Sequence, residues 1–80
     1  MTQYELDTLE LGHMCQRHKQ DSFLRVAENE EQCEIILSLS ERELVKIREM
    51  AGANKVMAYR LEPTEKGHQA MYARWKMQKN

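Results

Sequence analysis

Four side chains in the first half of the sequence are of types that bind metal ions: His13, Cys15, His18 and Cys33. A structural zinc site needs four ligands that converge tetrahedrally, usually from closely spaced pairs. On a helix, residues two apart point about 200° away from each other, so only Cys15 and His18 would share a face. Because no fourth ligand completes the set, we expect no metal site and two thiols that are buried as small apolar groups.

Cys15 and His18 are also the pair that could act as a nucleophile and its base. The sequence, however, has no glycine-rich phosphate loop, no G-x-S-x-G elbow and no H-E-x-x-H motif. A chain of 80 residues also offers little concavity in which to enclose a substrate. We therefore expect a protein that is not an enzyme and that needs no cofactor.

Binding of another macromolecule is the function class that remains, and the residues suited to it lie mainly toward the end of the chain. His68, Met71, Tyr72 and Trp75 stand at the spacing of one helical face. Methionine and aromatic residues clustered in this way are typical of protein interfaces, although docking onto the chain's own core would give the same pattern. The predicted partner-binding residues are Met71, Tyr72, Trp75, Met57 and Tyr59. The predicted contacts to nucleic acid or to an acidic partner are Lys55, Arg60, Lys66, Arg74, Lys76 and Lys79.

The charge is divided unevenly along the chain. Residues 1–40 carry three basic and eight acidic side chains, whereas residues 41–80 carry nine basic and five acidic ones. A half with a net charge of +4 is weakly basic for a protein that binds DNA alone, since affinity depends on the number of phosphates neutralised. We expect DNA to be contacted mainly through a complex with a second protein.

Helices are the elements that the sequence predicts. One proline and three glycines leave few interruptions. Residues 2–19 form the first predicted helix, with Tyr4, Leu11, Met14, Cys15 and His18 near one face, and residues 21–22 could cap a short apolar stretch at 23–27. Asn29 with Gln32, and then Ser40 with Glu43, read as two capping boxes, and Gly52 could end the second helix. This pattern predicts a helix hairpin joined at residues 38–40.

Residues 55–61 fit two structures. Met57, Tyr59 and Leu61 alternate at strand period, but the segment consists largely of good helix formers. Thr64 can cap a last helix at about 65–79. The predicted fold is a single all-α domain over residues 1–80 with four to five helices. Its predicted core is Leu9, Met14, Phe23, Ile36, Leu37, Leu44 and Ile47.

The expected setting is the cytoplasm, and the expected state is a homodimer. The first five residues are polar and acidic, and no apolar run approaches the roughly 18 residues of a membrane span. A chain this short buries a small core, so self-association is the expected stabiliser. We also expect no membrane and no small-molecule substrate among its partners.

Five short motifs lie within residues 21–61: Phe23-Leu24-Arg25-Val26, Asn29-Glu30-Glu31, Leu37-Ser38-Leu39, Leu44-Val45-Lys46-Ile47 and Asn54-Lys55-Val56-Met57-Ala58-Tyr59-Arg60-Leu61. In this order they resemble the FlhD family, the D subunits of the bacterial flagellar master activator and their mobile-element relatives. The resemblance implies an all-α homodimer, intertwined or packed, that acts as a transcription co-regulator. It also implies a second regulator subunit, with which the dimer would bind promoter DNA.

Two alternatives stay open. The segment Leu39-Ser40-Glu41-Arg42-Glu43-Leu44 is similar to the opening of LuxR-type DNA-binding domains, with residues 54–61 as the next helix and 66–76 as the recognition helix. The protein could instead be a phage- or plasmid-encoded antagonist that sequesters a host regulator. A target promoter, the identity of the partner and the sign of regulation do not follow from the sequence.

Overall fold

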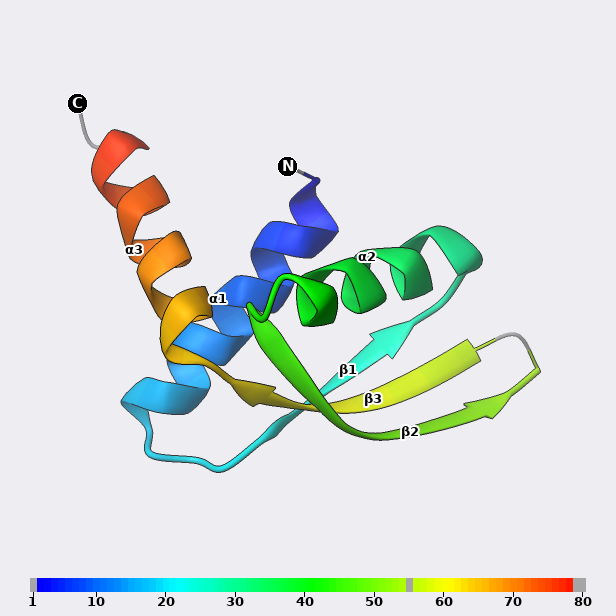
Figure 1. Cartoon of the computed structure of the whole chain (residues 1–80). Coiled ribbons are helices and arrows are strands. Elements are labelled where there is room, and N and C mark those ends of the chain that lie inside the picture. The colour runs from blue at the N-terminus through cyan, green and yellow to red at the C-terminus, as the bar shows by residue number, and fades with distance from the viewer. Residues whose placement is uncertain (1, 55, 79–80) are drawn as a thin grey trace.

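The structure, a computed structural model, describes residues 2–54 and 56–78, and for residues 53 and 75–78 it describes the backbone alone. The elements run in the order α1 (Gln3–Arg17), β1 (Phe23–Ala27), α2 (Glu30–Glu41), β2 (Val45–Ala53), β3 (Val56–Pro63) and α3 (Glu65–Gln78) (Figure 1). The fold is therefore α+β. The prediction of an all-α protein built on a central helix hairpin is wrong.

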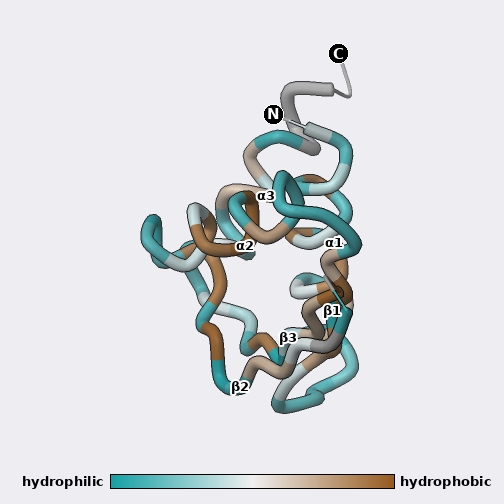
Figure 2. Tube along the Cα trace, turned by 90° about the vertical axis from the view of Figure 1, so that its right-hand side faces the viewer, coloured by the Kyte–Doolittle hydropathy of each residue, from teal (hydrophilic) through white to brown (hydrophobic). Residues whose placement is uncertain are grey.

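The strands form one antiparallel sheet in the order β1–β3–β2, so β3 lies in the middle. β1 pairs with β3 from Phe23 opposite Leu61 to Ala27 opposite Met57. The β2–β3 hairpin is longer, and its register shifts between Ile47 and Glu49, which makes Arg48 a bulge. The helices lie on one side of this sheet, and its other face, called the open face below, carries none of the described elements (Figure 1, Figure 2).

The core lies between the helices and the inner face of the sheet. Ile36 and Leu39 of α2 and Leu61 of β3 have no exposed surface. Of the predicted core, Leu9, Ile36 and Leu44 are buried, while Phe23 and Ile47 are half-buried and pack against it. Met14 and Leu37 are each 44% exposed, so these two core predictions are wrong.

The helix α1 buries a more polar face than its sequence suggested. Its buried residues are Glu5, Thr8, Leu9, Gly12, His13 and Cys15, whereas Leu11 and Met14 are exposed. The polar side chains can be buried because each has a partner. Thr8 donates to the Tyr4 carbonyl oxygen, and Glu5 pairs with Arg42, the C-cap of α2.

The predicted starts of two helices are confirmed. The Asn29 side chain accepts from the Gln32 amide at 2.9 Å and caps α2. The Thr64 hydroxyl accepts from the Gly67 amide at 2.9 Å and caps α3. The same hydroxyl also donates to carbonyl oxygens of residues 43 and 44, which ties the start of α3 to the end of α2.

The predicted helix after Ser40 does not form. α2 continues through Ser40 and ends at Glu41, with Arg42 as its C-cap, and the next residue, Glu43, takes a left-handed conformation with φ of 62°. The Leu44 amide then donates back to the Leu39 carbonyl at 2.9 Å, a Schellman arrangement in which two buried leucines meet. Residues 45–53 form β2, and Gly52, predicted to end a helix with a left-handed backbone, lies inside this strand.

The segment that fitted two structures is a strand. Residues 56–63 form β3, and Tyr59 and Leu61 point into the core as the alternation suggested. The LuxR-type interpretation needs a helix at 54–61 and does not fit this fold. Residues 23–27, read as a capped apolar stretch of an all-α chain, form β1.

Candidate protein-binding surface

The open face is built by strand alternation. In β1, Phe23, Arg25 and Ala27 face the helices, so Leu24 and Val26 face outward, with 62% and 48% of their surface exposed. Residues opposite each other in an antiparallel pair point to the same side. The pairing therefore gives two rows across the sheet, one of Val26, Ala58 and Ala51 and one of Leu24, Arg60 and Glu49.

The first row is apolar throughout, and the second carries one acid and one base. Arg60 lies 3.9 Å from the Glu49 carboxylate and donates to the Ser22 hydroxyl at 3.1 Å. Beyond these rows, Glu62 lies 3.9 Å from Lys46 and 3.6 Å from Arg48. A shallow hollow on this face is lined by Leu24, Glu49, Met50, Ala51, Ala58 and Arg60.

The β1 strand is fixed to α1 from behind. The Arg25 guanidinium lies 3.9 Å from the centre of the Tyr4 ring and donates to the Thr8 hydroxyl at 3.0 Å. The Tyr4 hydroxyl donates to the Val26 carbonyl oxygen at 2.7 Å. Burial raises the pKa of Tyr4 against the opposing effect of the Arg25 charge, so the hydroxyl keeps the proton that it donates. These contacts hold Leu24 and Val26 in place on the opposite face.

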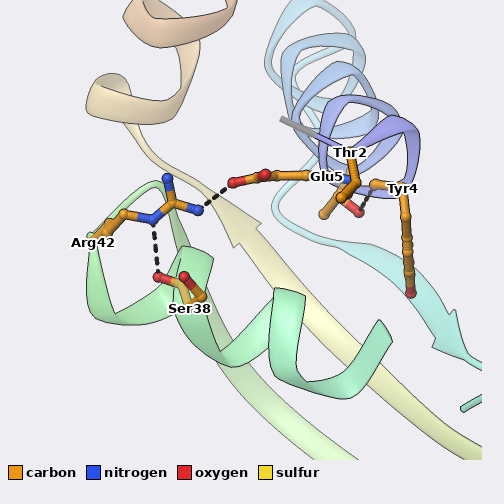
Figure 3. Close-up of polar contacts among 6 residues, drawn as sticks. Thr2, Tyr4, Glu5, Ser38 and Arg42 are labelled. Atoms are coloured by element: carbon orange, nitrogen blue, oxygen red, sulfur yellow. Dashed lines mark hydrogen bonds and ion pairs between the residues drawn. The ribbon is translucent and has the colours of Figure 1, made fainter. Parts of the chain in front are cut away.

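The two helices that cover the sheet are joined by an ion pair. Figure 3 shows Glu5 of α1 directed at the Arg42 guanidinium at the end of α2. The Arg42 side chain also donates to the Ser38 carbonyl oxygen at 3.4 Å (Figure 3). Because the Glu5 side chain is 11% exposed, this contact satisfies a carboxylate that would otherwise be buried alone.

A histidine pair joins α1 to α3. The Nδ1 atoms of His13 and His68 lie 2.9 Å apart, and their ring planes differ by 14° with centroids 4.7 Å apart. Burial, followed by the charge of His68, lowers the pKa of His13. One ring must donate and the other accept, so the accepting imidazole must be neutral.

The four side chains of metal-binding types, His13, Cys15, His18 and Cys33, are not grouped in the structure. The Cys15 thiol donates to the Gln20 carbonyl oxygen at 3.2 Å, and burial raises its pKa, which keeps it protonated. His18 is exposed, while Cys33 is half-buried at the edge of the core. Among the described residues, no three histidine, cysteine or acidic side chains are grouped so that they could hold an ion.

The predicted partner-binding residues are divided between the core and the surface. Tyr59 and Met71 are buried, with 2% and 7% of their surface exposed, and Met57 is half-buried. Tyr72 is 50% exposed on α3. The side chain of Trp75 lies outside the described part of the chain. The predicted aromatic stripe on α3 is therefore split, since Met71 faces inward and Tyr72 outward.

The predicted basic contacts are equally dispersed. Arg60 lies on the open face, Lys66 lies 4.0 Å from Glu43, and Arg74 is half-buried on α3. The side chains of Lys55, Lys76 and Lys79 lie outside the described residues.

Sequence reasoning missed Leu24 and Val26. The sequence did contain a signal for them, because successive residues of a strand point to opposite faces. Neighbouring apolar residues in a five-residue strand therefore lie on both faces.

No family model, curated protein or solved structure matches this chain. Within the described residues, no helix has the length and apolar character needed to cross a bilayer.

Proposed function

We propose that this protein is a non-catalytic binding module that works through protein–protein contacts, and that the open face is its binding surface. The observation that supports this is the position of Leu24 and Val26, which are exposed on the same face of β1, while the helices lie on the other side of the sheet (Figure 2). Complete burial of a leucine or valine contributes about 1.5–3 kcal/mol. With 62% and 48% of these side chains exposed, a partner that covers both gains roughly 2–3 kcal/mol.

The chemistry of the polar residues favours binding over catalysis. The Cys15 thiol is held protonated against a backbone carbonyl, and His13 is engaged with His68. The hollow on the open face is shallow, and its lining has one acid and one base already in contact with each other. These groups can orient a partner, but they include no activated nucleophile.

The wider role that we propose is that of a cytoplasmic transcription co-regulator which reaches DNA through a second protein. The described cations Lys46, Arg48, Arg60 and Lys66 each lie within 4.0 Å of a carboxylate. Such pairing reduces the number of charges available for phosphates, which favours contact with DNA through a complex. The regulatory part of the proposal rests on the resemblance of residues 21–61 to FlhD, and the all-α fold that this resemblance implied is not part of it.

A photoreactive phenylalanine analogue at position 24, activated in living cells, tests the binding surface. Position 37 is the matched control, because Leu37 is an exposed leucine on α2. We expect a protein adduct of defined mass from position 24 that disappears when Val26→Asp is added, and no such adduct from position 37. Equal labelling from both positions would refute the open face as the binding surface. If the partner captured in the adduct loses its DNA binding, the chain is an antagonist and not a co-regulator.

A further inference from the structure

We infer that the partner on the open face is a second copy of this chain, packed face to face about a two-fold axis. This inference rests on the proposed function, because it names the occupant of that same surface. A two-fold interface uses the same patch on both copies, so the patch must be complementary to itself. The shape, the charge and the size of the residues on the open face meet that requirement.

The shape is complementary because the open face has both a ridge and a hollow. Leu24 and Val26 stand along β1, at one edge of the sheet. Ala58 and Ala51 lie beside them on β3 and β2, and both line the hollow. Rotation by 180° places the β1 ridge of one copy over the alanines of the other. The small side chains then allow two sheets to approach to about 10 Å, the usual separation of stacked sheets.

The charges are complementary because the face carries one of each sign beside the hollow. Arg60 and Glu49 are opposite each other in the β2–β3 pairing and are 40% and 76% exposed. In a two-fold arrangement, Arg60 of one copy can meet Glu49 of the second copy, and the same contact occurs twice. A face with charges of one sign would repel a second copy, whereas this pair of opposite charges favours its approach.

A second copy would also stabilise the fold, because the core is small. Only ten apolar side chains are buried among the described residues, which is a small core for a chain of 80 residues. Domains of this size are marginally stable alone, and association with a second copy stabilises the folded state by mass action.

The test is a charge exchange between two variants of the full chain. Arg60→Glu leaves two acids on the face, and Glu49→Arg leaves two bases, so each variant should repel its own copies. When the two are mixed in equal amounts, every Arg meets a Glu across the interface, and a heterodimer should form. Sedimentation and native mass spectrometry should therefore find the wild-type chain at twice 9.5 kDa. Each variant alone should self-associate at least tenfold more weakly, and the equimolar mixture should regain the dimer mass.

A matched control uses the other described pair of exposed charges. Lys66 and Glu43 lie 4.0 Å apart, with side chains 62% and 81% exposed, away from the open face. Lys66→Glu and Glu43→Lys should each leave the dimer unchanged. Circular dichroism of every variant confirms that it is folded before its mass is interpreted.

Each outcome has a separate meaning. A wild-type chain that stays at 9.5 kDa while position 24 forms an adduct with another protein overturns the second copy but not the proposed function. A wild-type dimer that the charge variants leave intact, or that the mixture fails to restore, places the interface elsewhere and also overturns the inference. Failure of both the adduct and the dimer overturns the inference and the proposed function together.

Discussion

The end of α2 offers a direct test of why the chain turns into a strand at residue 45. Glu43 takes a φ of 62°, a conformation that a side chain with a Cβ disfavours. Its amide donates to the Ser40 carbonyl at 3.0 Å, and the next amide donates to Leu39 at 2.9 Å. Glycine is the usual residue at this position because it has no Cβ. We therefore predict that Glu43→Gly stabilises the protein.

The size of the effect follows from three contributions. The left-handed conformation costs a residue with a Cβ about 1–2 kcal/mol, which glycine avoids. Glycine gives the unfolded chain more freedom, which costs about 0.5–1 kcal/mol. The Glu43–Lys66 pair that is lost spans 4.0 Å between exposed side chains and contributes little. The net gain is roughly 0.5–1 kcal/mol, and the unfolding midpoint should rise by about 2–8 °C for a domain of this size.

Thermal and urea unfolding followed by circular dichroism measures this gain, at one fixed protein concentration because association shifts the midpoint. Glu34→Gly is the control, since Glu34 is exposed in the middle of α2. There glycine should cost about 1 kcal/mol. If Glu43→Gly lowers the midpoint as Glu34→Gly does, the backbone at residue 43 is not strained and the reasoning fails.

Three further perturbations test contacts described above. Asn29→Ala should cost about 0.5–2 kcal/mol in urea unfolding, because the Gln32 amide loses its acceptor; a loss too small to measure would mean that the cap contributes nothing. Gly67→Ala should lower the melting midpoint by the equivalent of about 1–3 kcal/mol, since its Cβ would overlap the Leu44 carbonyl oxygen, and an unchanged midpoint would contradict that close approach. The lowered pKa of His13 means that the unfolded chain binds the proton more readily, so stability should be full above pH 6.5 and should fall as the pH drops below it. His13→Gln should flatten the dependence of the urea unfolding midpoint on pH below pH 6.5. An unaltered profile would exclude His13 as the cause.

The helix starts could be predicted because they depend on neighbouring residues. Asn29 and Thr64 each cap the amide of the residue three positions ahead, and no distant contact is needed to form these bonds. The strand β2 could not be predicted in the same way. Ser40 and Glu43 fit a capping box, and Leu44 and Ile47 fit a helical face, whereas Val45 and Ile47 have the spacing of one strand face. Pairing with β3 decides between them, and this pairing joins residues up to 18 positions apart, as in Val45 opposite Pro63.

The candidate site depended on the same long-range information. Leu24 and Val26 are apolar, and the sequence does not show which face of their strand packs against the helices. They become surface residues because Tyr4, Thr8 and Arg25 hold the other side of β1 against α1. Arg60 was expected to contact nucleic acid or an acidic partner, and its place beside Glu49 became apparent only from the register of β2 and β3.

The bulge at Arg48 affects how the protein behaves when it is concentrated. β1 and β2 are the two edges of the sheet, and an edge with unpaired backbone groups can recruit strands from other molecules without limit. β1 has only five residues, while β2 is interrupted at Arg48 and carries the cationic side chains of Lys46 and Arg48, which are 74% and 51% exposed. Short length, a bulge and lysine or arginine on an edge all oppose strand addition. The dimer that we infer through the open face would therefore not be extended along its sheet edges into a cross-β fibre.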